Sequence, residues 1–273
     1  MLAFPNSKIN LGLYVTEKRT DGFHNIETIF FPIPLKDILE ILPLKNSVPD
    51  KVIFTNTGIQ VDCSAEKNLC IQAYNLLDAD FGLPPVEIIL HKAVPMGAGL
   101  GGGSADGAFT LSLLNQMFTL GLDNEKLAGY ASQLGSDCAF FIYNEPAMGT
   151  GRGEILYPVK VNLQGHYLAL VKPSVSVGTA EAYRDVKFGE PELPLLEIIS
   201  RPVTEWKALL KNNFEENILK NHPEIAAIKE KLYGSGAIYA CMSGSGSTVF
   251  GIFNKPAMLE GLFPGCFYWE GVL

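Results

Sequence analysis

The chain has 273 residues, of which 47% are hydrophobic, and this is enough for one sizeable core or two smaller ones. Lys and Arg number 21 against 29 Asp and Glu, so the net charge of -8 would repel a nucleic-acid backbone. The sequence shows neither a signal-peptide pattern nor an uncharged apolar run of membrane-spanning length. We therefore expect a cytoplasmic protein that binds neither nucleic acid nor membrane.

The five cysteines form an odd set without a C-x-x-C pair. Such a set fits neither a disulfide framework nor a zinc site. We expect all of them to be buried, reduced thiols. They are Cys63, Cys70, Cys138, Cys241 and Cys266.

The first half of the chain predicts strands followed by helices. Residues 7–14 alternate, with Lys8 and Asn10 on one face and Ile9 and Leu11 on the other, which predicts a half-buried strand. We expect further strands of an antiparallel meander at 26–31, 37–42 and 52–55, a helix at 65–79 and a strand at 86–90. Helices follow at 104–118, with Ser104 as N-cap, and from an Asp123 cap to a stop at Gly135.

The second half has the same mixed character. It predicts a strand at 167–171, helices near 179–186, 204–210 and 223–232, and a β-turn-β unit at 238–253. The Pro-rich stretch 191–202 is interpreted as a surface loop. Strands and helices do not alternate as βαβ units, so we predict an α+β fold with two domains, residues 1–160 and 161–273.

The most informative segment is Pro95-Met96-Gly97-Ala98-Gly99-Leu100-Gly101-Gly102-Gly103-Ser104-Ala105, hereafter the glycine-rich segment. Glycines let the main chain approach a ligand closely, and the helical pattern that follows offers unpaired N–H groups at its positive end. A simple turn needs only one or two glycines. We therefore interpret the segment as an anion-binding loop.

Other nucleotide and nucleophile motifs fit less well. Gly97 to Gly102 spell G-x-G-x-x-G, but six residues separate them from the predicted strand, and the acid at the expected distance, Asp123, is a helix cap. A Walker A motif is excluded because no lysine lies between Lys92 and Lys126. D-F-G at 80–82 precedes the segment and has no H-R-D partner, and G-x-S-x-G does not occur.

Three motifs together carry a family resemblance. The glycine-rich segment, the strand around Lys8 and the turn Ser243-Gly244-Ser245-Gly246-Ser247 resemble the galactokinase, homoserine kinase, mevalonate kinase and phosphomevalonate kinase superfamily. Within it, Ser7-Lys8-Ile9-Asn10-Leu11 followed by Arg19-Thr20-Asp21-Gly22-Phe23-His24 resembles the family of 4-diphosphocytidyl-2-C-methyl-D-erythritol kinases of the non-mevalonate isoprenoid pathway. Leu134-Gly135-Ser136-Asp137 and Gly153-Glu154-Ile155-Leu156 strengthen this resemblance.

The resemblance implies a fold and a reaction. The N-terminal domain would be like the second domain of ribosomal protein S5, and the C-terminal domain would be ferredoxin-like. ATP with Mg²⁺ would phosphorylate the 2-hydroxyl of a diphosphocytidyl methylerythritol. Asp137, whose alternative role is a turn cap, would be the general base, a function typically worth ~10²- to 10⁴-fold in rate. Lys8 would lie beside Asp137 and keep its carboxylate ionised.

The resemblance also implies binding residues. Asn10 and His24 would hydrogen-bond the cytosine edge, and Phe23 and Tyr183 would stack on the base. Phe23 departs from the family pattern, which generally has Tyr there. Thr179 would contact the diphosphate or the polyol.

Further implied residues lie at the phosphates. Ser104 is a candidate ligand of Mg²⁺ or phosphate, and Gly244 and Gly246 would let their turn close over the phosphates, with Ser243 and Ser247 left as turn residues. Cys138-Ala139 is another departure, since an aliphatic residue and often Pro follows the catalytic Asp in the family.

Two alternative functions remain open. Another kinase of the superfamily would act on homoserine, mevalonate or a sugar, and these acceptors have no base for Phe23, His24 and Tyr183 to bind. A nucleotide-binding protein without catalysis would not need both Lys8 and Asp137. The sequence does not distinguish a monomer from a homodimer.

Overall fold

The computed structural model describes residues 1–44, 51–61, 63–184, 186–189 and 191–273. Its contacts divide the chain into two compact units that interleave along the sequence. Unit 1 comprises Met1–Ser7, Leu35–Met96 and Gly101–Glu145, and unit 2 comprises Lys8–Pro34, Gly97–Leu100 and Pro146–Leu273. The boundary predicted at residue 160 stays a prediction, and it differs from this division in placing 8–34 and 97–100 with the first half.

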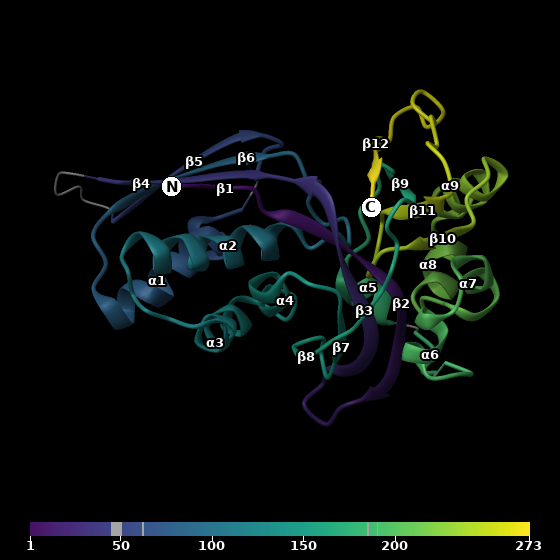
Figure 1. Cartoon of the computed structure of the whole chain (residues 1–273), viewed down its shortest axis with the longest axis horizontal. Helices are drawn as coiled ribbons and strands as arrows, with labels where there is room; N and C mark the ends of the chain where they lie inside the picture. Colours follow the sequence, from purple (N-terminus) through teal and green to yellow (C-terminus); the bar gives the residue numbers. More distant parts are fainter. Residues whose placement is uncertain (45–50, 62, 185, 190) are drawn as a thin grey trace. The chain divides into compact units, whose positions relative to one another are not determined.

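Unit 1 contains a four-stranded sheet in the order β1-β4-β6-β5, with α1 and α2 on one face (Figure 1). Its strands are β1 (Leu2–Ala3), β4 (Ile38–Pro43), β5 (Val52–Gly58) and β6 (Val86–Lys92). Its helices are η1 (Ala65–Lys67), α1 (Leu69–Phe81), α2 (Gly102–Met117), α3 (Asn124–Leu134) and α4 (Cys138–Tyr143).

The predicted antiparallel meander is wrong for β4 and β5. Strand β4 pairs with β1 and β6, and β5 runs parallel to β6. Parallel neighbours need a crossover connection, which α1 supplies between β5 and β6. The residue pattern therefore located β4, β5 and β6, but it predicted neither β1 nor the pairing of these strands.

Unit 2 contains two sheets. The first has the order β2-β3-β7-β8, and the second has the order β10-β11-β9-β12. The strands are β2 (Asn6–Lys18), β3 (His24–Lys36), β7 (Ala147–Thr150), β8 (Ile155–Pro158), β9 (Tyr167–Lys172), β10 (Tyr239–Met242), β11 (Val249–Phe253) and β12 (Phe267–Val272). The ends of β2 and β3, at residues 6–7 and 35–36, belong to unit 1.

The helices of unit 2 include two that the sequence did not predict, at 195–200 and 215–221. They are α5 (Thr179–Arg184), α6 (Leu195–Ser200), α7 (Val203–Leu209), α8 (Glu215–Asn221) and α9 (Pro223–Gly234). Helix α6 lies in the stretch predicted as a surface loop, and its Leu195, Ile198 and Ile199 are buried. Residue 185, inside the helix predicted at 179–186, lies outside the described residues.

Two further expectations need correction. Strand β2 is buried from Asn6 to Val15, so it is not half-buried, because its polar side chains also find partners inside the protein. Helix α2 begins at Gly102 with Gly101 as N-cap at a φ of +70°, so Ser104 lies within the first turn and is not the cap. The Asp123 cap is confirmed, since Oδ1 accepts from the Lys126 N–H at 2.9 Å.

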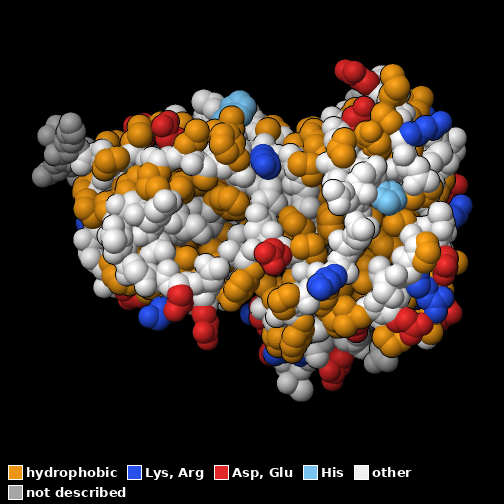
Figure 2. All heavy atoms as spheres, viewed as in Figure 1, with side chains coloured by type: hydrophobic (Ala, Val, Ile, Leu, Met, Phe, Trp, Pro, Cys, Tyr) orange, Lys and Arg blue, Asp and Glu red, His pale blue; other side chains and the backbone are white. Residues whose placement is uncertain are grey.

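The surface carries charges of both signs. On the face in view in Figure 2, Lys and Arg side chains lie singly among acidic and apolar ones. Among the helices of the described residues, none is long and apolar enough to cross a membrane.

Candidate active site

Lys8 is the centre of a buried polar cluster in unit 2. Its Nζ donates to Asn10 Oδ1 at 2.6 Å and to the Gly99 carbonyl at 3.1 Å, and its backbone N–H donates to the Leu100 carbonyl at 2.9 Å. The residue is only 3% exposed. An ammonium group is costly to bury unless acceptors surround it, so these bonds hold Lys8 against the glycine-rich segment. The predicted common face of Lys8 and Asn10 is confirmed.

Both polar atoms of the Asn10 side chain have a partner inside the protein. Oδ1 accepts from Lys8, and Nδ2 donates to Thr28 Oγ1 at 3.0 Å. Thr28 in turn donates to the Gly12 carbonyl. The amide therefore orients Lys8, and its predicted bond to cytosine stays a prediction.

Ser243 joins the glycine turn at 243–247 to the glycine-rich segment. Its hydroxyl donates to the Gly99 carbonyl at 2.8 Å and accepts from the Asn10 N–H at 3.3 Å. Gly244, at a φ of +55°, lies close enough that a Cβ would be 3.3 Å from Asn10 Oδ1. Sequence reasoning left Ser243 as a turn residue. The available signal was its place directly after the apolar run that forms β10.

An aromatic group in unit 2 brings together two predicted residues. The rings of His24 and Tyr183 stack, with centroids 4.6 Å apart and planes at 20°. Phe188, which the sequence did not single out, lies 5.8 Å from His24 between ring centroids. Thr179 opens α5, the helix that carries Tyr183 one turn later. This arrangement gathers aromatic rings around an imidazole.

The electrostatics of His24 favour a neutral ring. Burial lowers the pKa of His24, and the nearby Lys18 charge lowers it further. A neutral imidazole has one donor and one acceptor nitrogen, which suits the edge of a nucleobase. Phe23 remains 52% exposed, and the guanidinium of Arg152 lies 4.8 Å from its ring centroid. Arg152 is another residue that sequence reasoning missed.

In unit 1, Cys138 lies near Ser104 and directly after Asp137. Asp137 precedes α4, and its side chain makes no capping bond to this helix. Cys138 is buried and lies near Ser104 on the first turn of α2. Burial raises the pKa of the Cys138 thiol to about 12. The Cys138 departure from the family pattern thus places a buried thiol directly after Asp137 and near Ser104.

The first turn of α2 is suited to bind an anion. The helix runs for 16 residues from Gly102, and its first N–H groups have no partner within the helix.

Two family descriptions match this part of the chain and its C-terminal half: "GHMP kinases N terminal domain" covers residues 68–145, and "GHMP kinases C terminal" covers residues 196–260. The chain belongs to the GHMP kinase family. The predicted two-domain α+β kinase fold is thereby confirmed.

Two relatives of this GHMP kinase carry the same name. A protein of Parabacteroides distasonis, named 4-diphosphocytidyl-2-C-methyl-D-erythritol kinase, is 52% identical over 275 residues and covers 100% of both chains. A protein of Bacteroides fragilis with the same name is 53% identical over 254 residues, covering 93% of this chain and 92% of its own. The protein is therefore similar over its length to kinases of a diphosphocytidyl polyol, and it is itself a kinase.

Solved structures of kinases are also similar to this chain. A crystal structure of 4-(cytidine 5'-diphospho)-2C-methyl-D-erythritol kinase superposes with a TM-score of 0.84 at 32% identity, covering 99% of this chain and 98% of the other. A homoserine kinase from Cytophaga hutchinsonii gives a TM-score of 0.66 at 17% identity, covering 98% and 94%. The second likeness shows the shared fold alone.

The described residues contain no group of three or more His, Cys, Asp or Glu side chains able to hold a metal ion. A magnesium ion carried by nucleotide phosphates needs only one or two protein ligands. Ser104 fits such a role, because it lies on the first turn of α2 and a hydroxyl oxygen has lone pairs to offer.

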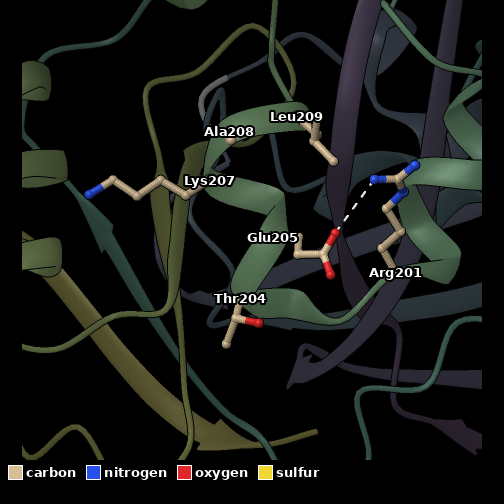
Figure 3. A pocket seen from close by; sticks show the side chains of 6 residues that line it. All are labelled: Arg201, Thr204, Glu205, Lys207, Ala208 and Leu209. Carbon is tan, nitrogen blue, oxygen red and sulfur yellow. Dashed lines mark ion pairs between the residues drawn. The ribbon is translucent and has the colours of Figure 1, made fainter.

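A surface depression of about 720 Å³ in unit 2 is separate from these residues. It is lined by Arg201, Thr204, Glu205, Lys207, Ala208 and Leu209 (Figure 3). Arg201 and Glu205 point toward each other at 3.5 Å and Lys207 points away. None of the site residues predicted from the sequence lines it, and we assign it no role in this GHMP kinase.

Proposed function

We propose that this GHMP kinase phosphorylates the 2-hydroxyl of 4-diphosphocytidyl-2-C-methyl-D-erythritol with ATP, in the cytoplasm, as a step toward isoprenoid precursors. The observation that carries the proposal is the stack of His24 on Tyr183, with Phe23 exposed next to His24 in the sequence. Aromatic faces bind a nucleobase by stacking, and a neutral imidazole pairs with its polar edge. Homoserine, mevalonate and sugars have no base to use these groups.

Asp137 is the proposed general base. Asp137 lies directly before α4, and the family resemblance of Leu134-Gly135-Ser136-Asp137 supports this role. It accepts the proton of the attacking hydroxyl as the bond to phosphorus forms.

Lys8 is the proposed source of positive charge. Asn10 and the Gly99 carbonyl fix its ammonium group in a buried setting, where a charge acts more strongly than in water. It favours the ionised form of the base and offsets negative charge on the transferring phosphoryl group. Asn10 also remains a proposed contact of the acceptor.

The ATP phosphates bind the glycine-rich segment and the first N–H groups of α2. Gly244 and Gly246 keep the glycine turn at 243–247 free of side chains that would block the phosphates. Thr179 contacts the acceptor. Ser104 would help the phosphates to hold magnesium, which would supply positive charge against the phosphate oxygens.

One assay tests the function. The protein is incubated with ATP, magnesium and one of three acceptors (diphosphocytidyl methylerythritol, mevalonate or homoserine), and ADP is measured. We expect ADP only with the first acceptor. Tyr183→Leu should raise the KM for diphosphocytidyl methylerythritol at least about tenfold, which is the effect expected from the loss of one base–aromatic stack. The KM for ATP should stay within about twofold. ADP with another acceptor alone, or with none, would overturn the proposal.

A further inference from the structure

Asp37, Lys92 and Asp106 form a buried ionic cluster in unit 1 that the proposed reaction does not use. Lys92 Nζ donates to Asp106 Oδ2 at 2.7 Å and also to Asp37 Oδ2. The three side chains are between 0 and 4% exposed. Burying such ions costs several kcal/mol each, and apolar side chains of the same volume often give an equally stable core. Stability alone therefore does not explain the cluster.

The cluster is tied to both ends of the glycine-rich segment. On the N-terminal side, Asp37 Oδ1 accepts from the backbone N–H groups of Ala93 at 2.6 Å and Val94 at 2.8 Å. On the C-terminal side, Asp106 belongs to α2, and a Cβ on Gly102 would lie 2.9 Å from Lys92 Nζ. The first turn of α2 therefore rests directly on the ammonium group.

Asp106 keeps an unusual feature for a core residue. Its Oδ1 is buried without a hydrogen-bond partner among the described residues. Burial raises the pKa of Asp106 to about 7; the Lys92 charge opposes this and the Asp37 charge adds to it. A buried polar network such as that of Asp106 holds the groups around it in one geometry, which an apolar side chain would not do.

We propose that Asp37, Lys92 and Asp106 are positioning residues that hold both ends of the glycine-rich segment in place before ATP binds. The inference rests on the proposed function, because it concerns the binding of ATP. Ordering one residue costs about 1–2 kcal/mol of conformational entropy, and glycine loses the most. A segment whose ends are already fixed loses less of this entropy on binding, so its affinity for phosphates is higher.

The main experiment uses Lys92→Met, which keeps the chain length of the side chain and removes the ammonium group, and Asp106→Asn, which keeps its shape. Affinity for an unhydrolysable ATP analogue is measured by calorimetry on the intact protein without acceptor, together with amide hydrogen exchange of residues 95–105. We expect Lys92→Met to weaken analogue binding about tenfold and to speed exchange of the ligand-free segment. Asp106→Asn should show smaller changes of the same sign.

Tyr74→Phe is the matched control. It removes the hydroxyl that donates to the Leu83 carbonyl at 3.2 Å and the Pro84 carbonyl at 3.0 Å, so it also weakens the interior of unit 1. It should lower the melting temperature without changing analogue affinity or exchange at 95–105. Lys92→Arg retains the charge and should recover part of the affinity.

The outcomes separate the two proposals. A Lys92→Met protein that is less stable but binds the analogue as tightly as wild type would overturn the positioning role and leave the proposed function intact. If Lys92→Met does not fold, unchanged affinity and exchange in Asp106→Asn would overturn it. A wild-type protein that binds no ATP analogue would overturn both proposals.

Discussion

Ser243 donates its hydroxyl to the carbonyl oxygen of Gly99 at 2.8 Å, across 144 positions of the sequence. The two residues are also in backbone contact, since a Cβ on Gly99 would lie 2.0 Å from the Ser243 carbonyl oxygen. No side chain can occupy that space. The glycine at 99 is therefore required by packing within unit 2 as well as by its φ of +73°.

Gly99→Ala should consequently be much more harmful than Gly97→Ala. Gly97 has a φ of +59°, but its Cβ would meet nothing within 4 Å, so alanine there bears only the left-handed strain of about 1–2 kcal/mol. Gly99→Ala must also displace backbone, and we expect at least twice that loss in the free energy of unfolding. Urea denaturation and kcat/KM of both variants check this, and equal losses would contradict it.

Asp137→Asn should lower kcat at least about 10²-fold, because the amide cannot accept the proton of the acceptor hydroxyl. Lys8→Met should have a similar effect through loss of the buried charge. Binding of ADP, measured by calorimetry, should stay within about threefold in both variants.

Asp123→Ala is the control for this pair. Asp123 is a confirmed helix cap, so its loss should cost about 1 kcal/mol of stability and leave kcat unchanged. A near-normal kcat in Asp137→Asn would remove that residue from the general-base role.

The comparison of these residues shows what sequence reasoning can and cannot provide. Local rules correctly placed Lys8 and Asn10 on one face of a strand and the Asp123 cap at a helix start. They failed at Ser104, because serine is the better cap by propensity, whereas Gly101 in a left-handed conformation starts the helix earlier.

Contacts between distant residues were beyond any local rule. The bond between Asn10 and Ser243 spans 233 positions, and the one between Lys92 and Asp37 spans 55. The parallel pairing of β5 with β6 also depends on where α1 packs rather than on the strand sequences. The family resemblance supplied the roles of the individual residues, and their buried support became visible only in the structure.

Thiol labelling should distinguish the cysteines by burial. Cys70, Cys138 and Cys241 are buried, whereas Cys63 and Cys266 are half-buried, so the expectation of five buried thiols was wrong for two of them. Burial raises the pKa of all three buried thiols, so little reactive thiolate forms at pH 8. A thiol reagent should label two cysteines in the native protein and five in urea. Mass spectrometry identifies the sites, and native labelling of Cys138 would contradict the result.

His24 should titrate below the ordinary histidine range. Burial against its neighbours disfavours the imidazolium, and Lys18 adds to this effect. An NMR titration of the imidazole proton should therefore give a pKa below 6.5, and Tyr183→Leu should move it back toward that value by opening one ring face to water. Lys18→Ala should produce a smaller upward shift. A wild-type pKa at or above 6.5 would show that the ring is not desolvated.

Asp106 should make stability fall as the pH rises toward neutrality. The folded-state pKa is raised to about 7 by burial, whereas an unfolded Asp titrates near ~3.9, so the folded state binds the extra proton between these values. The stabilisation is complete below the unfolded pKa and is lost as the pH rises through the folded pKa, with a slope of at most about 1.4 kcal/mol per pH unit.

The variant Asp106→Asn tests this prediction because its amide cannot titrate. Its free energy of unfolding relative to wild type should therefore rise between pH 5 and pH 8 in urea denaturation. A constant difference between Asp106→Asn and wild type would show that Asp106 is ionised throughout this range and that Lys92 compensates its burial.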